Sequence, residues 1–160
     1  MTAARRLPAI GFILITASCG TRVPVPSGGA AGTPRLGWVI MVGDRDNPDR
    51  EFVCQSEPRT PCVMPASRAD SQAFTDVHFY FHPASNDTTY SGKIQLGFFE
   101  GATPHELTPK VTVKRGESRA NTSVVGIVSS RPGTHAMTIA VTAESATPRE
   151  IREQVPIEVK

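Results

Sequence analysis

The residues with the most reactive side chains in this sequence are its three cysteines, at positions 19, 54 and 62. Cys54 and Cys62 enclose the segment QSEPRTP, whose two prolines indicate a turn. A compartment that permits oxidation would join two thiols so placed as a disulfide. The alternative is a metal-binding pair, but structural zinc cysteines usually stand about two to four residues apart and need two further ligands. We therefore predict a Cys54–Cys62 disulfide, which leaves Cys19 as an odd cysteine to explain.

Two histidines, His78 and His82, stand four residues apart. On a helix they would face the same way and could share a metal ion. The apolar and aromatic residues around them favour a strand instead, in which positions four apart lie about 13 Å from each other. The pair therefore cannot chelate one ion directly, and we expect two solvent-facing strand histidines.

A second possible metal site is the acidic run 44–51, whose carboxylates are the kind of oxygen ligand that calcium takes. The four carboxylates belong to Asp44, Asp46, Asp49 and Glu51. Two arginines within the run offset half of this charge, and Pro48 breaks the EF-hand pattern at a ligand position. A solvated loop is the expected structure, and calcium binding is the alternative.

Motifs that join a nucleophile to a base, or that cradle a phosphate, are absent from the sequence. It contains no G-x-S-x-G elbow, no H-E-x-x-H and no phosphate-binding glycine loop. We therefore expect neither an enzymatic activity nor a bound cofactor.

The elements that must position all these side chains are β-strands. Residues 36–43 are apolar almost without interruption, as in a central strand buried on both faces. Pro156 indicates an edge position or a bulge in the last strand. Strands are predicted at 36–43, 51–55, 61–65, 72–82, 89–99, 110–114, 121–129, 134–143 and 151–159, with loops at 44–50 and 67–72.

The clearest pattern belongs to residues 72–82 and 89–99, which both alternate between apolar and polar positions. If residue 82 pairs with residue 89, Val77 lies opposite Ile94 and Phe79 opposite Gly92, so that both faces of the two strands agree. We therefore predict a hairpin. Its inward side chains would be those of Val77, Phe79, Phe81, Ile94, Leu96 and Phe98. Its solvent-facing side chains would be those of His78, Tyr80, His82, Lys93 and Gln95.

Three aromatic residues, Phe74, Tyr80 and Phe99, fall on the outer side of this predicted hairpin. An exposed aromatic patch would mark a surface for a ligand or a partner. The alternative is that Phe74 covers Gly97 across the ladder, or that a loop covers all three rings.

About eight strands with turns at short intervals, and no helical period, predict an all-β fold in which a sandwich is favoured over a closed barrel. The segment PGTHAMTIAVTAE, followed by a final strand ending VPIEV, resembles the last two strands of bacterial immunoglobulin-like domains. The resemblance implies an immunoglobulin-like sandwich over residues 36–160. His135 stands where that family has a tyrosine, so the residue that supplies the hydroxyl contact of the tyrosine corner is missing here.

The first eighteen residues have the organisation of a secretory signal peptide. Arg5 and Arg6 form a basic head, residues 7–15 are apolar, and Thr16-Ala17-Ser18 are small. The last four residues before Gly20, TASC, resemble the lipobox of bacterial lipoproteins, in which the cysteine receives a diacylglyceryl thioether and becomes the new N-terminus. This resemblance implies lipidation of Cys19. An ordinary cleavage site near Ser18, or twin-arginine export through Arg5-Arg6, are the alternatives.

Residues 19–35 then form a flexible Gly/Pro-rich tether ahead of the domain. Gly20 stands where inner-membrane lipoproteins often carry aspartate, so the resemblance implies the outer membrane in a Gram-negative cell. The chain has 17 Lys and Arg against 15 Asp and Glu, and the signal segment contributes two of the arginines. A mature chain without net charge has no electrostatic footprint for nucleic acid.

Together these observations predict a membrane-anchored cell-envelope lipoprotein. We expect a non-enzymatic structural or protein-interaction role, with an envelope protein as its partner. The alternative is a ligand-binding module for a glycan or for calcium at the cell surface.

Overall fold

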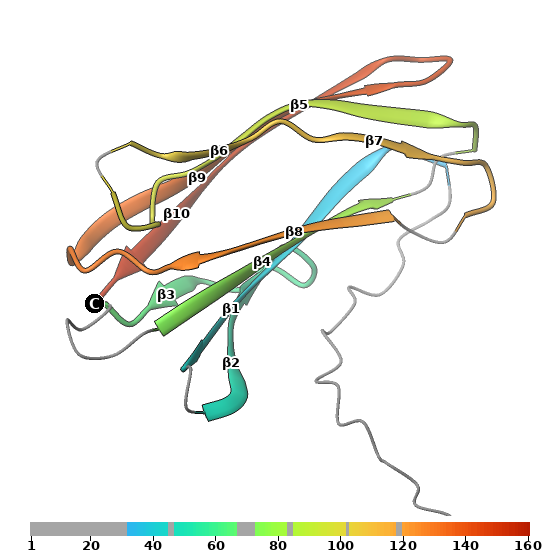
Figure 1. The fold of residues 1–160 in the computed structure, drawn as a ribbon. Helices are drawn as coiled ribbons and strands as arrows, with labels where there is room; N and C mark the ends of the chain where they lie inside the picture. The colour runs from blue at the N-terminus through green and yellow to red at the C-terminus, as the bar shows by residue number, and fades with distance from the viewer. Residues whose placement is uncertain (1–31, 45–46, 67–72, 83–84, 102, 118–119) are drawn as a thin grey trace, which may run out of the picture.

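The computed structural model describes residues 32–44, 47–66, 73–82, 85–101, 103–117 and 120–160. All regular structure in these residues is β-strand, arranged in two sheets that lie one above the other (Figure 1). The all-β sandwich predicted from the sequence is therefore confirmed. Ten strands are described, against the nine ranges predicted, and the one additional strand is a short one at His105–Leu107.

The first sheet has four strands and is antiparallel throughout. Across the sheet its members are β2 (Asn47–Gln55), β1 (Arg35–Asp44), β4 (Ala73–His82) and β8 (Ala120–Ile127). The expected loop at 44–50 is too long, because Asn47 already pairs with Asp44 in the β1–β2 ladder.

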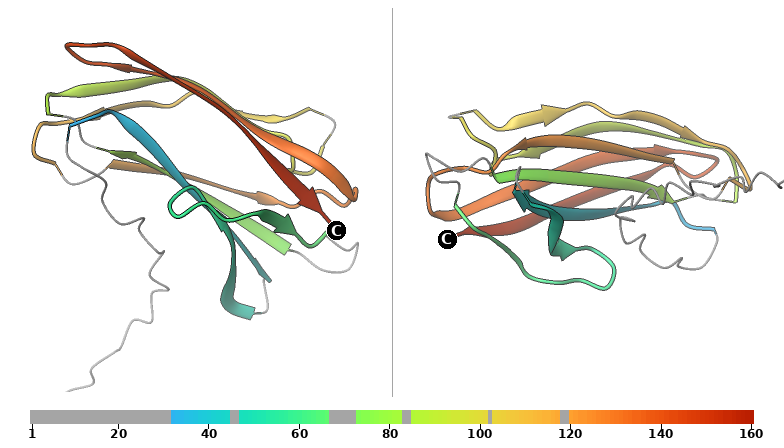
Figure 2. Two further views of the ribbon diagram at one scale, coloured as in Figure 1. Left: turned by 180° about the vertical axis from the view of Figure 1, so that it is seen from behind. Right: turned by 60° about the horizontal axis from the view of Figure 1, so that its bottom comes forward.

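The second sheet has six strands. Across the sheet they are β3 (Cys62–Met64), β10 (Arg149–Val159), β9 (Gly133–Glu144) and β5 (Thr88–Leu96), which then pairs with both β6 (His105–Leu107) and β7 (Lys110–Val113). β3 runs parallel to β10, beside the C-terminal end of the chain (Figure 2). Pro156 lies one residue before β3 begins to pair with β10, so its missing N–H falls where that side of β10 is open.

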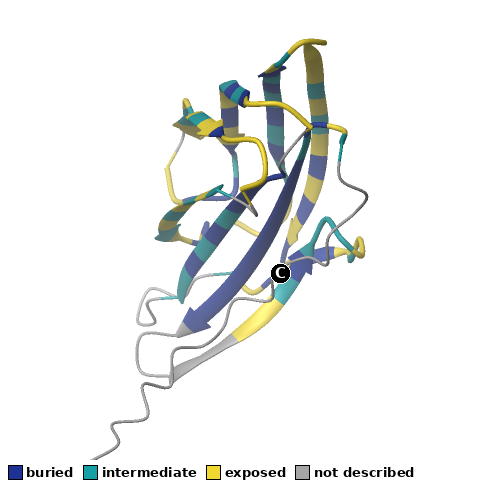
Figure 3. Cartoon of the chain, turned by 90° about the vertical axis from the view of Figure 1, so that its right-hand side faces the viewer, coloured by how far each residue is buried: buried dark blue, intermediate teal, exposed yellow. Residues whose placement is uncertain are grey.

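The strand β1 is buried on both of its faces, as its continuous apolar sequence predicts (Figure 3). Trp38 and Ile40 point into the space between the sheets and belong to the main core. Val39 and Met41 point the other way and form a second, small cluster with Tyr80 on the outer face of the same sheet.

The side-chain faces predicted for the two alternating strands are confirmed for the core. The six apolar residues expected to point inward are all completely buried, namely Val77, Phe79, Phe81, Ile94, Leu96 and Phe98. On the opposite face of the second strand, Lys93 and Gln95 are exposed, also as expected.

The prediction that β4 and β5 form a hairpin is wrong. β4 pairs with β1 and β8, whereas β5 pairs with β9 in the other sheet, so the chain crosses between sheets after His82. Two strands that face each other across a sandwich present their apolar rows to the same core, as two strands of one ladder do. Alternation therefore identified the inward face of each strand but not its partner.

A buried tyrosine connects the two strands where the predicted ladder would have been. The Tyr90 hydroxyl on β5 donates a hydrogen bond of 2.5 Å to the backbone carbonyl of His82 on β4, and the Phe81 and Tyr90 rings lie 5.0 Å apart. Burial raises the pKa of the Tyr90 hydroxyl above its usual value. The neutral side chain thus links the two sheets.

The side chain of His135 also contacts the backbone. Its Nε2 lies 2.9 Å from the carbonyl oxygen of Arg131, four residues upstream, and its Nδ1 lies 3.2 Å from that of Gly97. The imidazole therefore lies between two backbone carbonyls, one of them four residues upstream.

The core assignment predicts unequal costs for two truncations. Phe79→Ala removes a completely buried ring and should lower the free energy of unfolding by about 3–5 kcal/mol. Val125→Ala, at a side chain that is 57% exposed, should change it by no more than about 0.5 kcal/mol. Chemical denaturation measures both, and equal costs would contradict the assignment.

The Tyr90 hydrogen bond predicts a pH-dependent difference between Tyr90→Phe and the native chain. The substitution leaves a buried carbonyl without its donor, which should cost about 1–3 kcal/mol near neutral pH. Because the folded pKa of Tyr90 is raised, its contribution is present below about pH 10, where unfolded tyrosine ionises, and is lost as the pH rises further. Denaturation between pH 8 and about 11 should show the difference shrinking; a difference independent of pH would refute the role of this hydroxyl.

Candidate functional site

The two cysteines of the predicted pair form a disulfide that joins the two sheets. Cys54 lies on β2 of the four-stranded sheet and Cys62 on β3 of the six-stranded sheet, with Cα atoms 4.9 Å apart. Both residues are buried. The predicted disulfide is confirmed, and neither sulfur has the thiolate that a metal ligand or a nucleophile requires.

The turn enclosed by this disulfide places Glu57 beside the first residue of β1, Arg35, and the last residue of β4, His82. Glu57 Oε1 lies 3.2 Å from Arg35 Nη1, and Glu57 Oε2 lies 3.7 Å from His82 Nε2. Arg35 Nη2 is in turn 3.5 Å from His82 Nδ1. Three polar side chains from three separate segments therefore meet at one end of the four-stranded sheet.

His82 is buried, contrary to the expectation that it faces solvent. Its ring lies over Gly37 on β1, where an added Cβ would come within 3.1 Å of Nε2. The absence of a side chain at Gly37 leaves the space that the imidazole fills. Sequence alternation gives the side on which His82 points, but not this covering by the Glu57 turn.

A second polar link crosses the sandwich at Glu153. The indole Nε1 of Trp38 on β1 donates to Glu153 Oε2 on β10 at 3.4 Å, and Arg59 Nη1 lies 2.9 Å from Glu153 Oε1. The buried ring of Trp38 thereby satisfies its N–H at the carboxylate that also pairs with the arginine. The sequence of the disulfide turn and that of β10 contain no pattern that would have predicted the contacts of Glu153 with Trp38 and Arg59.

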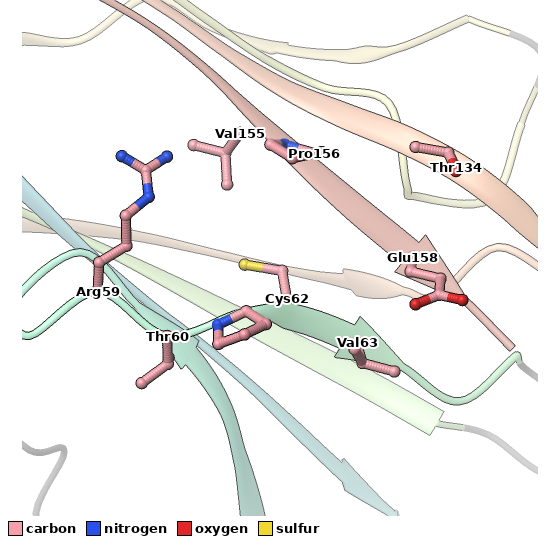
Figure 4. Close-up of a pocket in the computed structure, with 9 residues that line it drawn as sticks. Arg59, Thr60, Cys62, Val63, Thr134, Val155, Pro156 and Glu158 are labelled. Carbon is pink, nitrogen blue, oxygen red and sulfur yellow. The ribbon is translucent and has the colours of Figure 1, made fainter.

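A surface pocket of about 340 Å³ lies beside the disulfide (Figure 4). It is lined by side chains of the β2–β3 turn, β3, β9 and β10, and Cys62 lies at its centre in the view of Figure 4. Its charged groups already have partners: Arg59 pairs with Glu153, and Glu158 lies 3.5 Å from Lys160 Nζ. Among the residues that line it, none forms a nucleophile–base pair.

The outer face of the four-stranded sheet is more apolar than a solvated sheet face usually is. One row across it reads Phe52, Met41, Asp76 and Val125, from β2 to β8. The exposed fractions of Phe52 and Val125 are 39% and 57%, and Ile127 on β8 is exposed as well. Three of the four exposed large hydrophobic residues in the described chain thus lie on this one face.

Two residues at the centre of this face are less exposed than predicted. Tyr80, expected in solvent, is buried against Val39 and Met41. The side chain of His78 is only 14% exposed; it stacks on Tyr80 at a ring distance of 6.4 Å and lies 3.9 Å from an Asp76 oxygen. The expectation of a plain solvent-facing row is therefore wrong for Tyr80 and overstated for His78.

The three aromatic residues proposed as a ligand patch do not form one exposed surface. Phe74 is half-buried on the outer face, Tyr80 is buried, and Phe99 belongs to the main core. The ring of Phe99 occupies the space left by Gly126, where a Cβ would come within 2.8 Å of it. A ligand-binding role for the three residues stays a prediction.

The acidic run 44–51, considered for calcium, lies only partly within the described residues. Asp44 ends β1, Asp49 and Glu51 lie on β2, and Asp46 falls outside the described residues. Within the described part of the chain, no group of three or more His, Cys, Asp or Glu side chains is placed to hold a metal ion. Calcium binding at this run stays a prediction, as does lipidation of Cys19, which also lies outside the described residues.

Comparison with known proteins adds no relative: no protein-family model matches the chain, and no curated protein matches it. Among the described residues, no helix is of a length and hydrophobicity that would cross a bilayer.

The disulfide predicts a thiol count and a stability difference. Alkylation of unreduced protein should leave Cys54 and Cys62 unmodified. The double variant Cys54→Ala/Cys62→Ala should unfold more easily, because the bond no longer restricts the unfolded chain. The loop that the bond closes is short, which limits the expected loss to about 2.5 kcal/mol. Denaturation with and without a reductant measures the effect; alkylation of both cysteines in the native protein would refute the bridge.

Proposed function

We propose that this protein is a cell-envelope lipoprotein, anchored through Cys19, whose immunoglobulin-like sandwich has a non-enzymatic structural or protein-interaction role. The observation that carries the proposal is the N-terminal sequence. A basic head, a short apolar run and the segment TASC together match what lipoprotein processing needs. In a Gram-negative cell, the glycine at position 20 favours the outer membrane.

The position of the domain relative to the anchor supports this proposal. The first strand begins at Arg35, so residues 20–34 separate the folded sandwich from the lipidated cysteine. A segment of this length spans about 50 Å when extended. The domain can therefore reach partners away from the bilayer surface while its N-terminus stays anchored.

The surface of the sandwich supports a role in contact rather than in catalysis. Exposed apolar side chains gather on the outer face of the four-stranded sheet, and such gathering is typical of interaction surfaces. The pocket beside the disulfide, by contrast, is lined by charges that are already paired. The proposed partner is another envelope protein.

The lipid anchor predicts the behaviour of Cys19→Ser. The variant lacks the sulfur that receives the diacylglyceryl group, so it should leave the membrane fraction or accumulate as an uncleaved precursor. Fractionation of producing cells, with immunodetection of the chain, measures both outcomes.

The matched control is the double variant Cys54→Ser/Cys62→Ser, which loses two sulfurs but keeps Cys19. It should remain in the membrane fraction and migrate as the mature form. If Cys19→Ser fractionates and migrates as the native chain does, the anchor is wrong.

A further inference from the structure

The strand β8 forms an edge of the four-stranded sheet, with β4 on one side and no strand on the other among the described residues. Its sequence, ANTSVVGI, has no charged residue and no proline. It pairs with β4 over eight consecutive positions without a register shift. An edge of this kind presents a row of backbone N–H and C=O groups that can pair with a further strand.

The remaining edges in the described structure carry features that prevent such pairing. β2 has two register shifts, a proline and three charged residues. β3 and β6 are three residues long and follow a proline, and β7 begins with a lysine after a proline. The open part of β10 contains four charged residues and Pro156. Such features are the usual protection of natural sheet edges, and β8 lacks all of them.

Several apolar side chains of β8 are also less buried than those of the neighbouring strand β4. Val125 and Ile127 point outward and are exposed, and even the inward-facing Val124 is only half-buried. At the C-terminal end of the strand, the Glu100 N–H donates to the Ile127 carbonyl at 2.9 Å. Among the residues that the structure describes, the open part of the edge therefore runs from Ala120 to Gly126.

We propose that β8 pairs antiparallel with β8 of a second copy of this chain, which joins two four-stranded sheets into one. A twofold axis brings each residue near the axis close to its own copy, so any charge there would meet a like charge. β8 meets no such repulsion, because it carries no charge. The pairing also places the exposed apolar side chains of the two outer faces side by side.

The alternation of the strand limits the register. Outward-facing residues must pair with outward-facing residues if the joined sheet is to keep one outer face. The twofold axis must then pass between one residue and its own copy, and Ser123 is at the centre of the open run 120–126. In this register Ser123 faces its own copy, and Asn121 faces Val125 of the second copy.

Cysteine substitutions in the full chain test this register. Ser123→Cys should form a disulfide-linked dimer in producing cells, because the paired Cβ atoms at the axis lie about 5 Å apart. Val125→Cys alone should not, since its two copies would lie about 13 Å apart along the strands. The double variant Asn121→Cys/Val125→Cys should crosslink again. Non-reducing electrophoresis gives the yields, and the same series in a Cys19→Ser background excludes crosslinks through Cys19.

A charge at the axis tests the association itself. In sedimentation of the purified full chain, Ser123→Lys should shift the protein from dimer to monomer, whereas Ser123→Thr should keep the dimer. The matched control is Val63→Lys, at a residue that is 40% exposed on the edge strand β3, and it should remain dimeric. The proposal is overturned if the native chain is monomeric, if Ser123→Cys crosslinks no more than Val125→Cys, or if it crosslinks only to a different protein. The anchor can fail without affecting any of these results, because none of them requires the lipid.

Discussion

The burial of two apolar sheet faces against each other is the constraint on which the rest of this structure depends. β1 and β4 contribute one inner face, and β5 and β9 most of the other. Three specific links add to this packing: the Cys54–Cys62 bond, the Tyr90 hydrogen bond and the Trp38 contact with Glu153. Each joins a residue of one sheet to a residue of the other, so the relative placement of the sheets is fixed by directional contacts as well as by apolar packing.

The sequence was a good guide to strands and inner faces, because both follow from a period of two that can be read within one segment. It could not distinguish a partner in the same sheet from one in the opposite sheet, since Val77 and Ile94 would be buried in either case. The sequence pattern also does not predict contacts in which a ring packs where a glycine has no side chain. Gly37 makes room for the His82 ring, and Gly126 makes room for the Phe99 ring.

The outer face of β4 illustrates how far such reasoning reaches. Its alternation places His78, Tyr80 and His82 on the side away from the core, and the structure agrees with that direction. Their burial depends on residues distant in the sequence: Val39 and Met41 beside Tyr80, and Glu57 and Gly37 beside His82. The pattern within one strand contains no information about these neighbours. It therefore predicts that His78, Tyr80 and His82 all face solvent.

The proposed anchor and the proposed pairing of β8 would reinforce each other. Chains held to one surface by a tether meet at a higher effective concentration than chains free in solution. An unprotected edge then finds its own copy more readily, and the joined sheet presents two outer faces to a partner. The N-terminal segment and the edge of the domain would thus act together, although each can be tested without the other.

The lipid anchor is tested most directly by the mass of the N-terminal peptide of the mature protein, isolated from the envelope of producing cells. We expect a peptide that begins at Cys19 and carries the added mass of a thioether-linked diacylglyceryl group. A mature N-terminus elsewhere, with Cys19 unmodified or removed, would contradict the anchor.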